Sequence, residues 1–523
     1  MSKWMTVGDV LRVLATHYPN KEGAADLSRS LTFKEWNERS NRLANGLLGL
    51  GLRKGDRVAF IAHNCLEWME YYAAAAKAGL VCVPVLFRLS PQEYRFILED
   101  CEAKAFLVAQ DFVEGARSVR SSLPLVEHWI HVGKGSGPEG FVGYEELIAR
   151  GAPEEPPVEV HHEDVWTIMY TSGTTGKPKG VVRTHESYAA FYLTNIAAMG
   201  FERNDRALIV MPMSHVNSIY YGFTFTYCGG TPVIYSRESF DPEHFLQTLR
   251  DYRISFTSLV PTHYIMILSL ADSVKKSYDV SCIRKLLCSS APARKDTKLG
   301  ILEFFDKSEL YEAYGSTEAG KVTLLPPEMQ FEKLGSIGRE MLGTDLIKLL
   351  DEDRNEVGVG EVGELFSRTP ACFREYWRRP EETRAAFHGD WFSAGDMAYR
   401  DEEGYYYLVD RKKNMIISGG ENVYPSEVEN VIGGHPAVKD VAVVGVPDPK
   451  WGERVTAVVV LNEGHAPSPE LAASIQDFCK DKIAGYKRPK DLQFIPDAEM
   501  PRTATGKILH RKLRERYGHW SDS

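Results

Sequence analysis

Residues 58–85 read VAFIAHNCLEWMEYYAAAAKAGLVCVPV, and this stretch decides the fold class. The apolar runs 58–61 and 81–85 have the length of buried strands. The alanine-rich segment between them, residues 66–78, contains no helix breaker and has the length of a helix. Strands that alternate with helices in this way predict an α/β fold built from layers around parallel sheets.

The same alternation extends to both sides of this stretch. Thr32 and Glu35 have the spacing of a capping box, which predicts a helix that continues to Gly51. Residues 135–158, rich in glycine and proline, are expected to form a loop-rich interruption.

Two domains are expected. From about Leu346 the pattern changes to strand pairs separated by turns, which predicts a β-rich subdomain inside a large N-terminal domain, residues 1–411. The charged stretch 410–414 then precedes a compact segment, so a small α+β C-terminal domain is placed at residues 412–523.

Composition excludes several classes of protein. The 523 residues are 43% hydrophobic and 26% charged, as in ordinary globular proteins, and the formal net charge of -10 disfavours a nucleic acid partner. The eight cysteines are scattered without metal-ligand spacing. We see no secretory signal and no apolar run of membrane-spanning length, so we expect a cytoplasmic protein without integral membrane association.

A glycine- and hydroxyl-rich loop is the most specific motif. Residues 170–180 read YTSGTTGKPKG, between an apolar run and an expected helix from about Glu186. Glycines let backbone N–H groups face an anion, hydroxyls add donors and lysines add positive charge, so a polyphosphate is the predicted ligand. Pro178 excludes the Walker pattern, and the alternative is a flexible turn. The candidate nucleotide-binding residues here are Thr171, Ser172, Gly173, Thr174, Thr175, Gly176, Lys177 and Lys179.

This loop resembles the phosphate loop of the adenylate-forming superfamily, which contains acyl-CoA synthetases, luciferases and peptide-synthetase adenylation domains. The further motifs of that superfamily follow in order over residues 170–507. Residues 311–318, YEAYGSTE, resemble the motif in which an aromatic ring stacks on adenine, a threonine contacts phosphate and a glutamate binds Mg²⁺.

The resemblance implies roles for individual residues. Thr317, Glu318, His215 and Lys507 would be catalytic, with Glu318 as the metal ligand and Lys507 bridging the carboxylate and the α-phosphate. Further nucleotide contacts would come from Ser290, Ala291, Pro292, Glu312, Ala313, Tyr314, Gly315, Asp396 and Arg411. The acyl pocket would be lined by His215, Asn217, Ser218, Tyr220, Thr262, Ser289 and Gly315. The hinge and the coenzyme A channel would contain Lys413, Ser418, Gly419, Gly420 and Glu421, and the resemblance implies that the small C-terminal domain is mobile about this hinge.

The reaction implied is an AMP-forming acid–CoA ligation that uses ATP, Mg²⁺, coenzyme A and a small carboxylic acid. The aromatic and hydroxyl residues of 219–227 favour a bounded pocket for a short, medium, branched, cyclic or aromatic acid, although Tyr220 and its neighbour could instead pack in the core. Alternatives are transfer to a carrier-protein phosphopantetheine, oxidation of the adenylate, and a catalytically silent nucleotide-binding homologue. The oligomeric state is left open, with a homodimer as one candidate.

Overall fold

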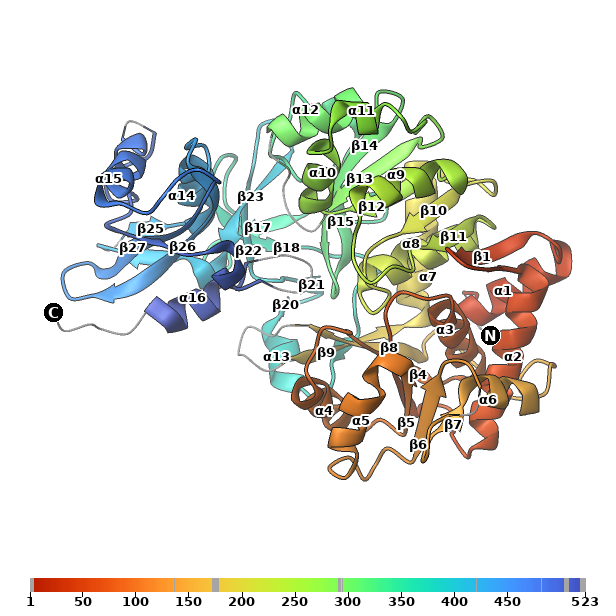
Figure 1. Ribbon diagram of the computed structural model, residues 1–523. Coiled ribbons are helices and arrows are strands. Elements are labelled where there is room, and N and C mark those ends of the chain that lie inside the picture. The colour runs from red at the N-terminus through yellow and green to blue at the C-terminus, as the bar shows by residue number, and fades with distance from the viewer. Residues whose placement is uncertain are drawn as a thin grey trace. The chain divides into compact units, whose positions relative to one another are not determined.

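The chain forms two compact units. The computed structural model describes residues 4–135, 137–171, 178–289, 293, 295–419, 421–480, 482–502 and 508–517. The first unit contains Met1–Ile347 and Ser367–Phe392, and the second contains Lys348–Phe366 and Ser393–Ser523 (Figure 1). The boundary expected after residue 411 falls inside the second unit, and the hinge at Lys413 stays a prediction.

The first unit contains an eight-stranded sheet in the order β19-β9-β8-β4-β3-β5-β6-β7. The strands from β8 to β7 along this order run parallel, whereas β9 and β19 are added antiparallel. Their bounds are β3 (Arg57–Ile61), β4 (Val81–Val85), β5 (Ala105–Ala109), β6 (His128–Val132), β7 (Val142–Gly143), β8 (Val165–Thr171), β9 (Lys179–Thr184) and β19 (Glu375–Tyr376).

A second, nine-stranded sheet has the order β16-β15-β14-β13-β12-β10-β11-β1-β2. Its centre, from β14 to β1, is parallel, and β15, β16 and β2 pair antiparallel at the two edges. The bounds are β1 (Glu22–Asp26), β2 (Ser30–Thr32), β10 (Arg206–Ile209), β11 (Thr231–Ile234), β12 (Phe256–Leu259), β13 (Lys285–Ser289), β14 (Glu309–Ser316), β15 (Gly320–Leu325) and β16 (Arg339–Glu340). A short ribbon of β20 (Phe387–His388) and β21 (Trp391–Phe392) completes the strands of this unit.

Helices cover both faces of both sheets. One core cluster joins the facing sides of the two sheets through α1, α2, α3, α7 and α8; a second joins the eight-stranded sheet to α4 and α5, and a third joins the nine-stranded sheet to α9, α10 and α12 (Figure 1). Among the described residues, none of the helices combines the length and hydropathy that a membrane span requires. The bounds are α1 (Val7–His17), α2 (Phe33–Gly49), α3 (Glu67–Ala78), α4 (Pro91–Asp100), α5 (Val113–Arg120), α6 (Tyr144–Arg150), α7 (His185–Met199), α8 (Val216–Tyr227), α9 (Pro242–Asp251), α10 (Pro261–Leu268), α11 (Asp272–Lys275), α12 (Lys295–Phe304) and α13 (Pro380–Ala385), with 3₁₀ turns η1 (Gln110–Phe112) and η2 (Pro327–Met329).

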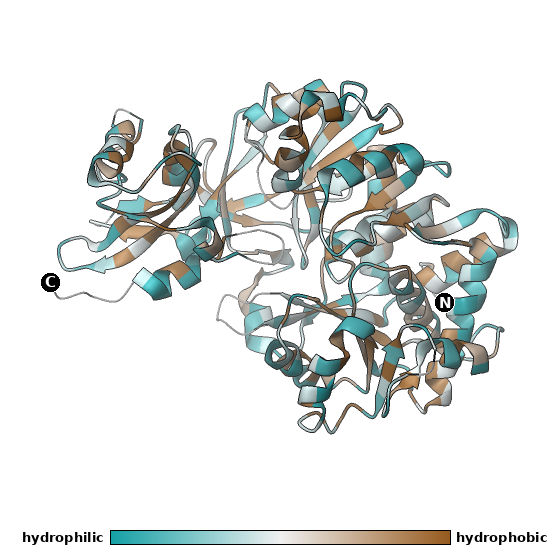
Figure 2. Cartoon of the chain, in the orientation of Figure 1, coloured by the Kyte–Doolittle hydropathy of each residue, from teal (hydrophilic) through white to brown (hydrophobic). Residues whose placement is uncertain are grey.

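Strand β3 illustrates how the sequence produces this layering. Val58 and Phe60 belong to the core cluster on one side of the sheet, and Ala59 and Ile61 belong to the cluster on the other side. Successive side chains of a strand point to opposite faces, so a strand covered by helices on both faces must be apolar throughout. In Figure 2, hydrophobic colour concentrates on the strands and on the helix faces that meet them.

The predicted α/β class and the early elements are confirmed. The Thr32 hydroxyl accepts a hydrogen bond from the Glu35 backbone, and the Glu35 carboxylate accepts one from the Thr32 backbone, so the capping box begins α2 as expected. Residues 135–158 are loop-rich, as expected, around the short elements β7 and α6. The helix expected from about Glu186 is confirmed by α7, but the strand before it was not foreseen. The phosphate-loop sequence is followed by strand β9 and only then by α7, because Gly180 to Thr184 pairs antiparallel with β8.

The second unit contains two sheets. A four-stranded antiparallel sheet has the order β17-β18-β22-β23, and a five-stranded sheet has the path β25-β24-β27-β26, with β28 parallel to β27. The bounds are β17 (Lys348–Leu350), β18 (Gly363–Phe366), β22 (Asp396–Arg400), β23 (Tyr406–Arg411), β24 (Ile416–Ser418), β25 (Glu421–Val423), β26 (Val438–Asp448), β27 (Gly452–Leu461), β28 (Asp491–Phe494), α14 (Pro425–Ile432), α15 (Pro469–Phe478) and α16 (His510–Tyr517), with η3 (Lys412–Asn414) and η4 (Asp497–Glu499). The predicted strand pairs after Leu346 are confirmed by β17 and β18.

A buried glutamate joins three helices of the first unit. Glu70 of α3 is fully buried, and its two carboxylate oxygens accept hydrogen bonds from Arg39 Nε of α2 and from the Tyr144 hydroxyl of α6, each at 2.7 Å. Burial raises the pKa of Glu70, opposed by the Arg39 guanidinium. A buried charge is tolerated when its partners remain in place, so this carboxylate requires α2, α3 and α6 to pack together.

We expect Glu70→Ala to lower the free energy of unfolding by about 3–5 kcal/mol, because Arg39 and Tyr144 lose their buried partner. Glu67→Ala is the matched control. Glu67 lies one turn earlier on α3 and pairs with Arg29 at a partly exposed position, so its loss should cost about 0–1 kcal/mol. Urea unfolding followed by circular dichroism gives the comparison, and equal midpoint shifts for the two variants would contradict the role of Glu70.

Candidate active site

The turn between β14 and β15 carries two predicted catalytic residues, Thr317 and Glu318. The Phe373 backbone N–H donates to the Glu318 carbonyl at 2.6 Å, and the Tyr376 hydroxyl donates to Glu318 Oε1 at 2.9 Å. The Ser316 hydroxyl accepts from the Ala319 backbone N–H at 3.0 Å. Both the Thr317 and the Glu318 side chains stay partly exposed. The turn is therefore fixed through its backbone while these two side chains remain accessible.

A buried arginine forms a hydrogen bond with the backbone of this turn. Arg183 of β9 has 0% exposure, and its Nη1 donates to the Thr317 carbonyl at 2.6 Å and to the Tyr220 hydroxyl at 2.5 Å. Its Nη2 donates to the Ala371 carbonyl at 2.5 Å. Sequence reasoning missed Arg183, although a charged residue in the otherwise apolar strand 180–184 was a signal that could have identified it.

Tyr376 brings the base of the phosphate loop to the same turn. Lys179, at the start of β9, places its ammonium 5.0 Å from the centre of the Tyr376 ring, while the hydroxyl of that ring binds Glu318. Thr171, at the end of β8, is the cross-strand partner of Lys179. Tyr376 therefore contacts both the end of the phosphate-loop sequence and the Thr317–Glu318 turn, which are distant in sequence. Sequence reasoning also missed Tyr376.

A polar cluster lies at the carboxyl edge of the nine-stranded sheet. Asn217, in the first turn of α8, donates from Nδ2 to the Ser258 hydroxyl at 3.0 Å and to the Ser289 hydroxyl at 3.4 Å. The two serines lie 3.3 Å apart on the neighbouring parallel strands β12 and β13. Ligands of α/β proteins bind at this edge. Asn217 and Ser289 were predicted site residues, and Ser258 adds a third hydroxyl that its place near a strand end could have indicated.

His215 caps α8 beside this cluster. Its Nδ1 accepts a hydrogen bond from the Asn217 backbone N–H at 3.3 Å, which leaves Nε2 to carry the proton. Burial lowers the pKa of His215 to about 4, so the ring is neutral at physiological pH. The imidazole can therefore donate a hydrogen bond to a carboxylate without adding positive charge.

The other predicted acyl-pocket residues differ in burial and in their contacts. The Ser218 hydroxyl is buried and donates to the Met211 carbonyl at 2.7 Å, so it is used within the fold. Tyr220 is buried as well, with its ring stacked on Phe191 at a centroid distance of 3.6 Å. Thr262 is exposed in the first turn of α10.

The residues expected near adenine lie along β14. Glu312 is buried and forms an ion pair of 2.6 Å with the fully buried Lys298 of α12. Ala313 and Tyr314 are partly exposed and Gly315 is exposed. A β-carbon on Gly315 would lie only 2.0 Å from the Gly320 carbonyl oxygen, so no other residue fits this hairpin without backbone movement.

In the second unit, Asp396 and Arg411 are cross-strand neighbours on β22 and β23. Arg411 Nε lies 3.0 Å from Asp396 Oδ1, and the Asp396 side chain is largely buried. The two residues expected to contact ribose and phosphate therefore form one ion pair.

The hinge and channel residues of the second unit lie just after this pair. The Lys413 carbonyl accepts a hydrogen bond from Arg514 Nη1 at 2.8 Å. Ser418 and Glu421 face each other across the β24–β25 pairing, and Gly419 between them has a φ of +63°, which favours glycine. The Gly419 N–H donates to the Trp451 carbonyl at 2.7 Å.

Several predicted site residues lie outside the described residues. They are Ser172, Gly173, Thr174, Thr175, Gly176, Lys177, Ser290, Ala291, Pro292, Gly420 and Lys507.

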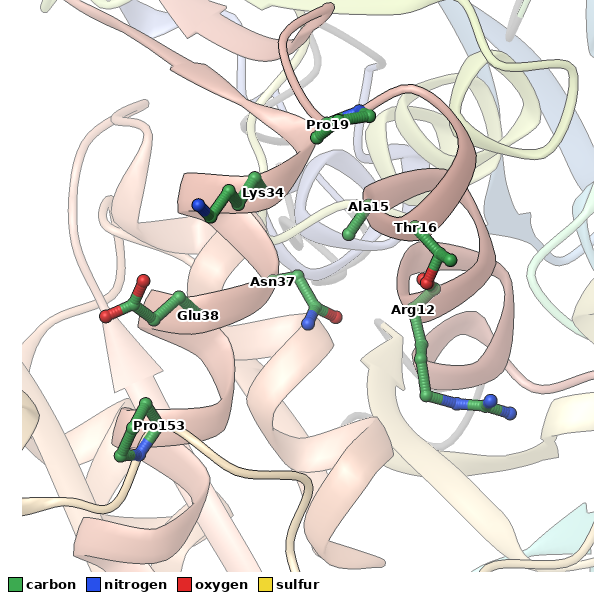
Figure 3. A pocket seen from close by; sticks show the side chains of 8 residues that line it. All are labelled: Arg12, Ala15, Thr16, Pro19, Lys34, Asn37, Glu38 and Pro153. Carbon is green, nitrogen blue, oxygen red and sulfur yellow. The ribbon is translucent and has the colours of Figure 1, made fainter.

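An open pocket of about 440 Å³ lies elsewhere in the first unit, between α1, α2 and a loop (Figure 3). No predicted site residue lines it, and the lining side chains come from two helices and from loops. The lining residues are Arg12, Ala15, Thr16, Pro19, Lys34, Asn37, Glu38 and Pro153.

Comparison with known proteins places these features in a family. Residues 11–377 match the model of the AMP-binding enzyme family, and residues 427–507 match that of the AMP-binding enzyme C-terminal domain. The chain is 35% identical to the long-chain-fatty-acid–CoA ligase FadD13 of Mycobacterium tuberculosis, covering 98% of both chains. It is 33% identical to the fatty acid–[acyl-carrier-protein] ligase ScoC of Streptomyces coeruleorubidus, over 97% of this chain and 95% of that protein. The crystal structure of the anthranilate CoA ligase AuaEII with anthranoyl-AMP superimposes with a TM-score of 0.89 at 28% identity, covering 99% of this chain and 98% of that one. The chain therefore belongs to the AMP-binding enzyme family, the adenylate-forming enzymes that its motifs resemble.

Proposed function

We propose that this protein is an ATP-dependent, AMP-forming acid–CoA ligase for a short, medium, branched, cyclic or aromatic carboxylic acid. In the first partial reaction, a carboxylate oxygen attacks the α-phosphorus of ATP, an acyl-adenylate forms and pyrophosphate leaves. In the second, the sulfur of coenzyme A attacks the acyl carbon, the thioester forms and AMP leaves. The observation that carries the proposal is a set of three contacts. Arg183 and Tyr376 each form a hydrogen bond with the Thr317–Glu318 turn, and the Lys179 ammonium lies beside the Tyr376 ring.

Phosphoryl transfer depends on positioning and on neutralising charge. Arg183 binds the Thr317 carbonyl and Tyr376 binds the Glu318 carboxylate, so the turn that carries both side chains is held in place before substrate binds. Lys179 contributes positive charge at the base of the phosphate loop.

The Glu318 carboxylate fits a magnesium ion. Its Oε1 is oriented by Tyr376, and the partly exposed side chain keeps oxygen atoms for a hard cation that commonly binds one or two carboxylates together with phosphate oxygens. When bound, Mg²⁺ would supply further neutralisation of the phosphate charge.

The cluster expected beside the reacting carboxylate consists of polar, uncharged side chains. Asn217, Ser258 and Ser289 share hydrogen bonds at the edge of the sheet, and the neutral His215 caps the same helix. An uncharged donor such as His215 can bind a carboxylate and still release it as an attacking nucleophile, since it does not form a strong ion pair with it.

The wall of the expected acyl pocket favours a bounded acid. α8 supplies large aromatic side chains, and Tyr220 is fixed by Arg183 on its hydroxyl and by Phe191 on its ring. Such a wall has few ways to open into a long channel, because close-packed aromatic cores resist rearrangement.

Pyrophosphate release from ATP and Mg²⁺, measured over linear, branched, cyclic and aromatic acids with and without coenzyme A, tests the function directly. We expect turnover with one of these classes and a thioester product that requires coenzyme A. Parallel reactions with a phosphopantetheinylated carrier protein test the alternative acceptor. Oxygen consumption would reveal oxidation of the adenylate instead. ATP binding without pyrophosphate release for every acid would contradict the proposal and favour a silent homologue.

Lys507→Ala should separate the two partial reactions. We expect adenylate formation to fall by about a hundredfold or more, because the charge between carboxylate and α-phosphate is lost, while presynthesised acyl-adenylate is still converted to thioester. Lys512→Ala, an exposed lysine in α16, is the control and should retain both activities. Equal loss of both activities in Lys507→Ala would count against its role.

Lys413→Pro should impair the second reaction selectively. The superfamily rotates its small domain between the two steps, and proline fixes φ and removes the N–H at the residue expected to rotate. We expect pyrophosphate release to be retained and thioester formation to fall, with Lys413→Ala close to the unmodified enzyme in both. Retention of thioester formation by Lys413→Pro would exclude the hinge at this residue.

A further inference from the structure

We propose that Lys321 binds a second carboxylate at the far end of the acid, so that the preferred substrates are dicarboxylic acids. This inference rests on the proposed ligase function and specifies its substrate class. Three features support it: the position of Lys321, the absence of an acidic partner for it among the described residues, and the aromatic side chains that surround it.

The Lys321 ammonium is enclosed by apolar and aromatic groups. Lys321 belongs to β15 and is only 6% exposed. Its Nζ lies 3.5 Å from the Met199 sulfur, 5.3 Å from the centre of the Tyr221 ring and 6.0 Å from that of Phe191. Aromatic faces attract a cation, but more weakly than a carboxylate does in the same place.

Two other buried lysines of the first unit, Lys77 and Lys298, differ from Lys321 in having an acidic partner. Lys77 lies 2.7 Å from a carboxylate oxygen of Glu155, and Lys298 lies 2.6 Å from one of Glu312. In the part of the chain that the structure describes, Lys321 forms no ion pair. Burial lowers the pKa of Lys321 to about 7, as expected for an ammonium group that has no acidic side chain beside it.

Lys321 lies next to the expected acyl pocket. It is the cross-strand partner of Gly315, which the superfamily places against the acid. Tyr221, which contacts the ammonium, lies four residues after Asn217 on α8, and residues with this spacing share one face of a helix. The rise between them is roughly 6 Å. An acid whose reacting carboxylate lies near Asn217 and His215 would therefore extend along α8 toward Lys321.

The amine of Lys321 would let the site distinguish dicarboxylic acids from monocarboxylic acids. A second carboxylate would favour the ammonium form of Lys321 and give it a partner of opposite charge, whereas a methyl terminus would leave the buried amine without a carboxylate partner in an apolar enclosure. A site built around a buried polar group rejects analogues that lack the complementary group more strongly than a purely apolar pocket does. We therefore expect dicarboxylic acids to be favoured over monocarboxylic acids of the same chain length by about tenfold or more in kcat/KM.

The test compares matched pairs of acids in pyrophosphate release by the full-length enzyme. Straight-chain dicarboxylic acids of increasing length are each paired with the monocarboxylic acid of the same carbon number, and an aromatic pair is added. Lys321→Met keeps the length of the side chain and removes the charge. We expect it to lose activity on the dicarboxylic acids and to gain activity on the monocarboxylic acids, with the KM for ATP unchanged. A gain cannot result from misfolding.

Lys77→Met is the matched control, because Lys77 is also buried but lies on α3 and has its own acidic partner. It should keep the preference of the unmodified enzyme. If monocarboxylic acids react and Lys321→Met leaves the ratio between the paired acids unchanged, the role of Lys321 is overturned while the ligase function stands. If no acid of either kind releases pyrophosphate, the proposed function itself fails and this inference fails with it.

Discussion

The hydrogen bonds of the buried Arg183 are the constraint on which the site depends. Arg183 belongs to β9 of the eight-stranded sheet, and the Thr317 carbonyl that it binds belongs to a turn at the end of the nine-stranded sheet. The same guanidinium fixes Tyr220 on α8, the helix packed between the two sheets. One side chain therefore sets the position of the Thr317–Glu318 turn relative to both the β8–β9 hairpin and the wall of the expected acyl pocket.

The sequence predicted features that depend on local patterns. The capping box at Thr32, the strand at Val58 and the strand pair after Leu346 were all confirmed, because capping and alternation involve residues close in the chain. The strand after the phosphate loop was not foreseen, since its pairing with β8 requires a hairpin geometry that glycine and threonine composition does not specify. Arg183 and Tyr376 were missed because their partners are distant in sequence.

The candidate residues differ in whether their polar groups are already bound to partners within the fold. Ser218 and Glu312 use their polar groups on buried partners, whereas Asn217 and Ser289 form a cluster at the sheet edge where ligands of this architecture bind. Sequence motifs identify residue types and order, but they do not say which hydroxyl or carboxylate is already satisfied. That distinction needs the three-dimensional partners, because burial and pairing decide whether a polar group is available.

Tyr376 has a further consequence for the energetics of substrate binding. Its hydroxyl orients Glu318 and its ring accepts the Lys179 ammonium, so the place expected for a cation and the place expected for phosphate share one side chain. Linkage between two ligands is reciprocal: if cation binding shifts this ring and thereby strengthens anion binding, anion binding must strengthen cation binding by the same factor. Nucleotide and metal affinities would then rise or fall together when this one ring is altered.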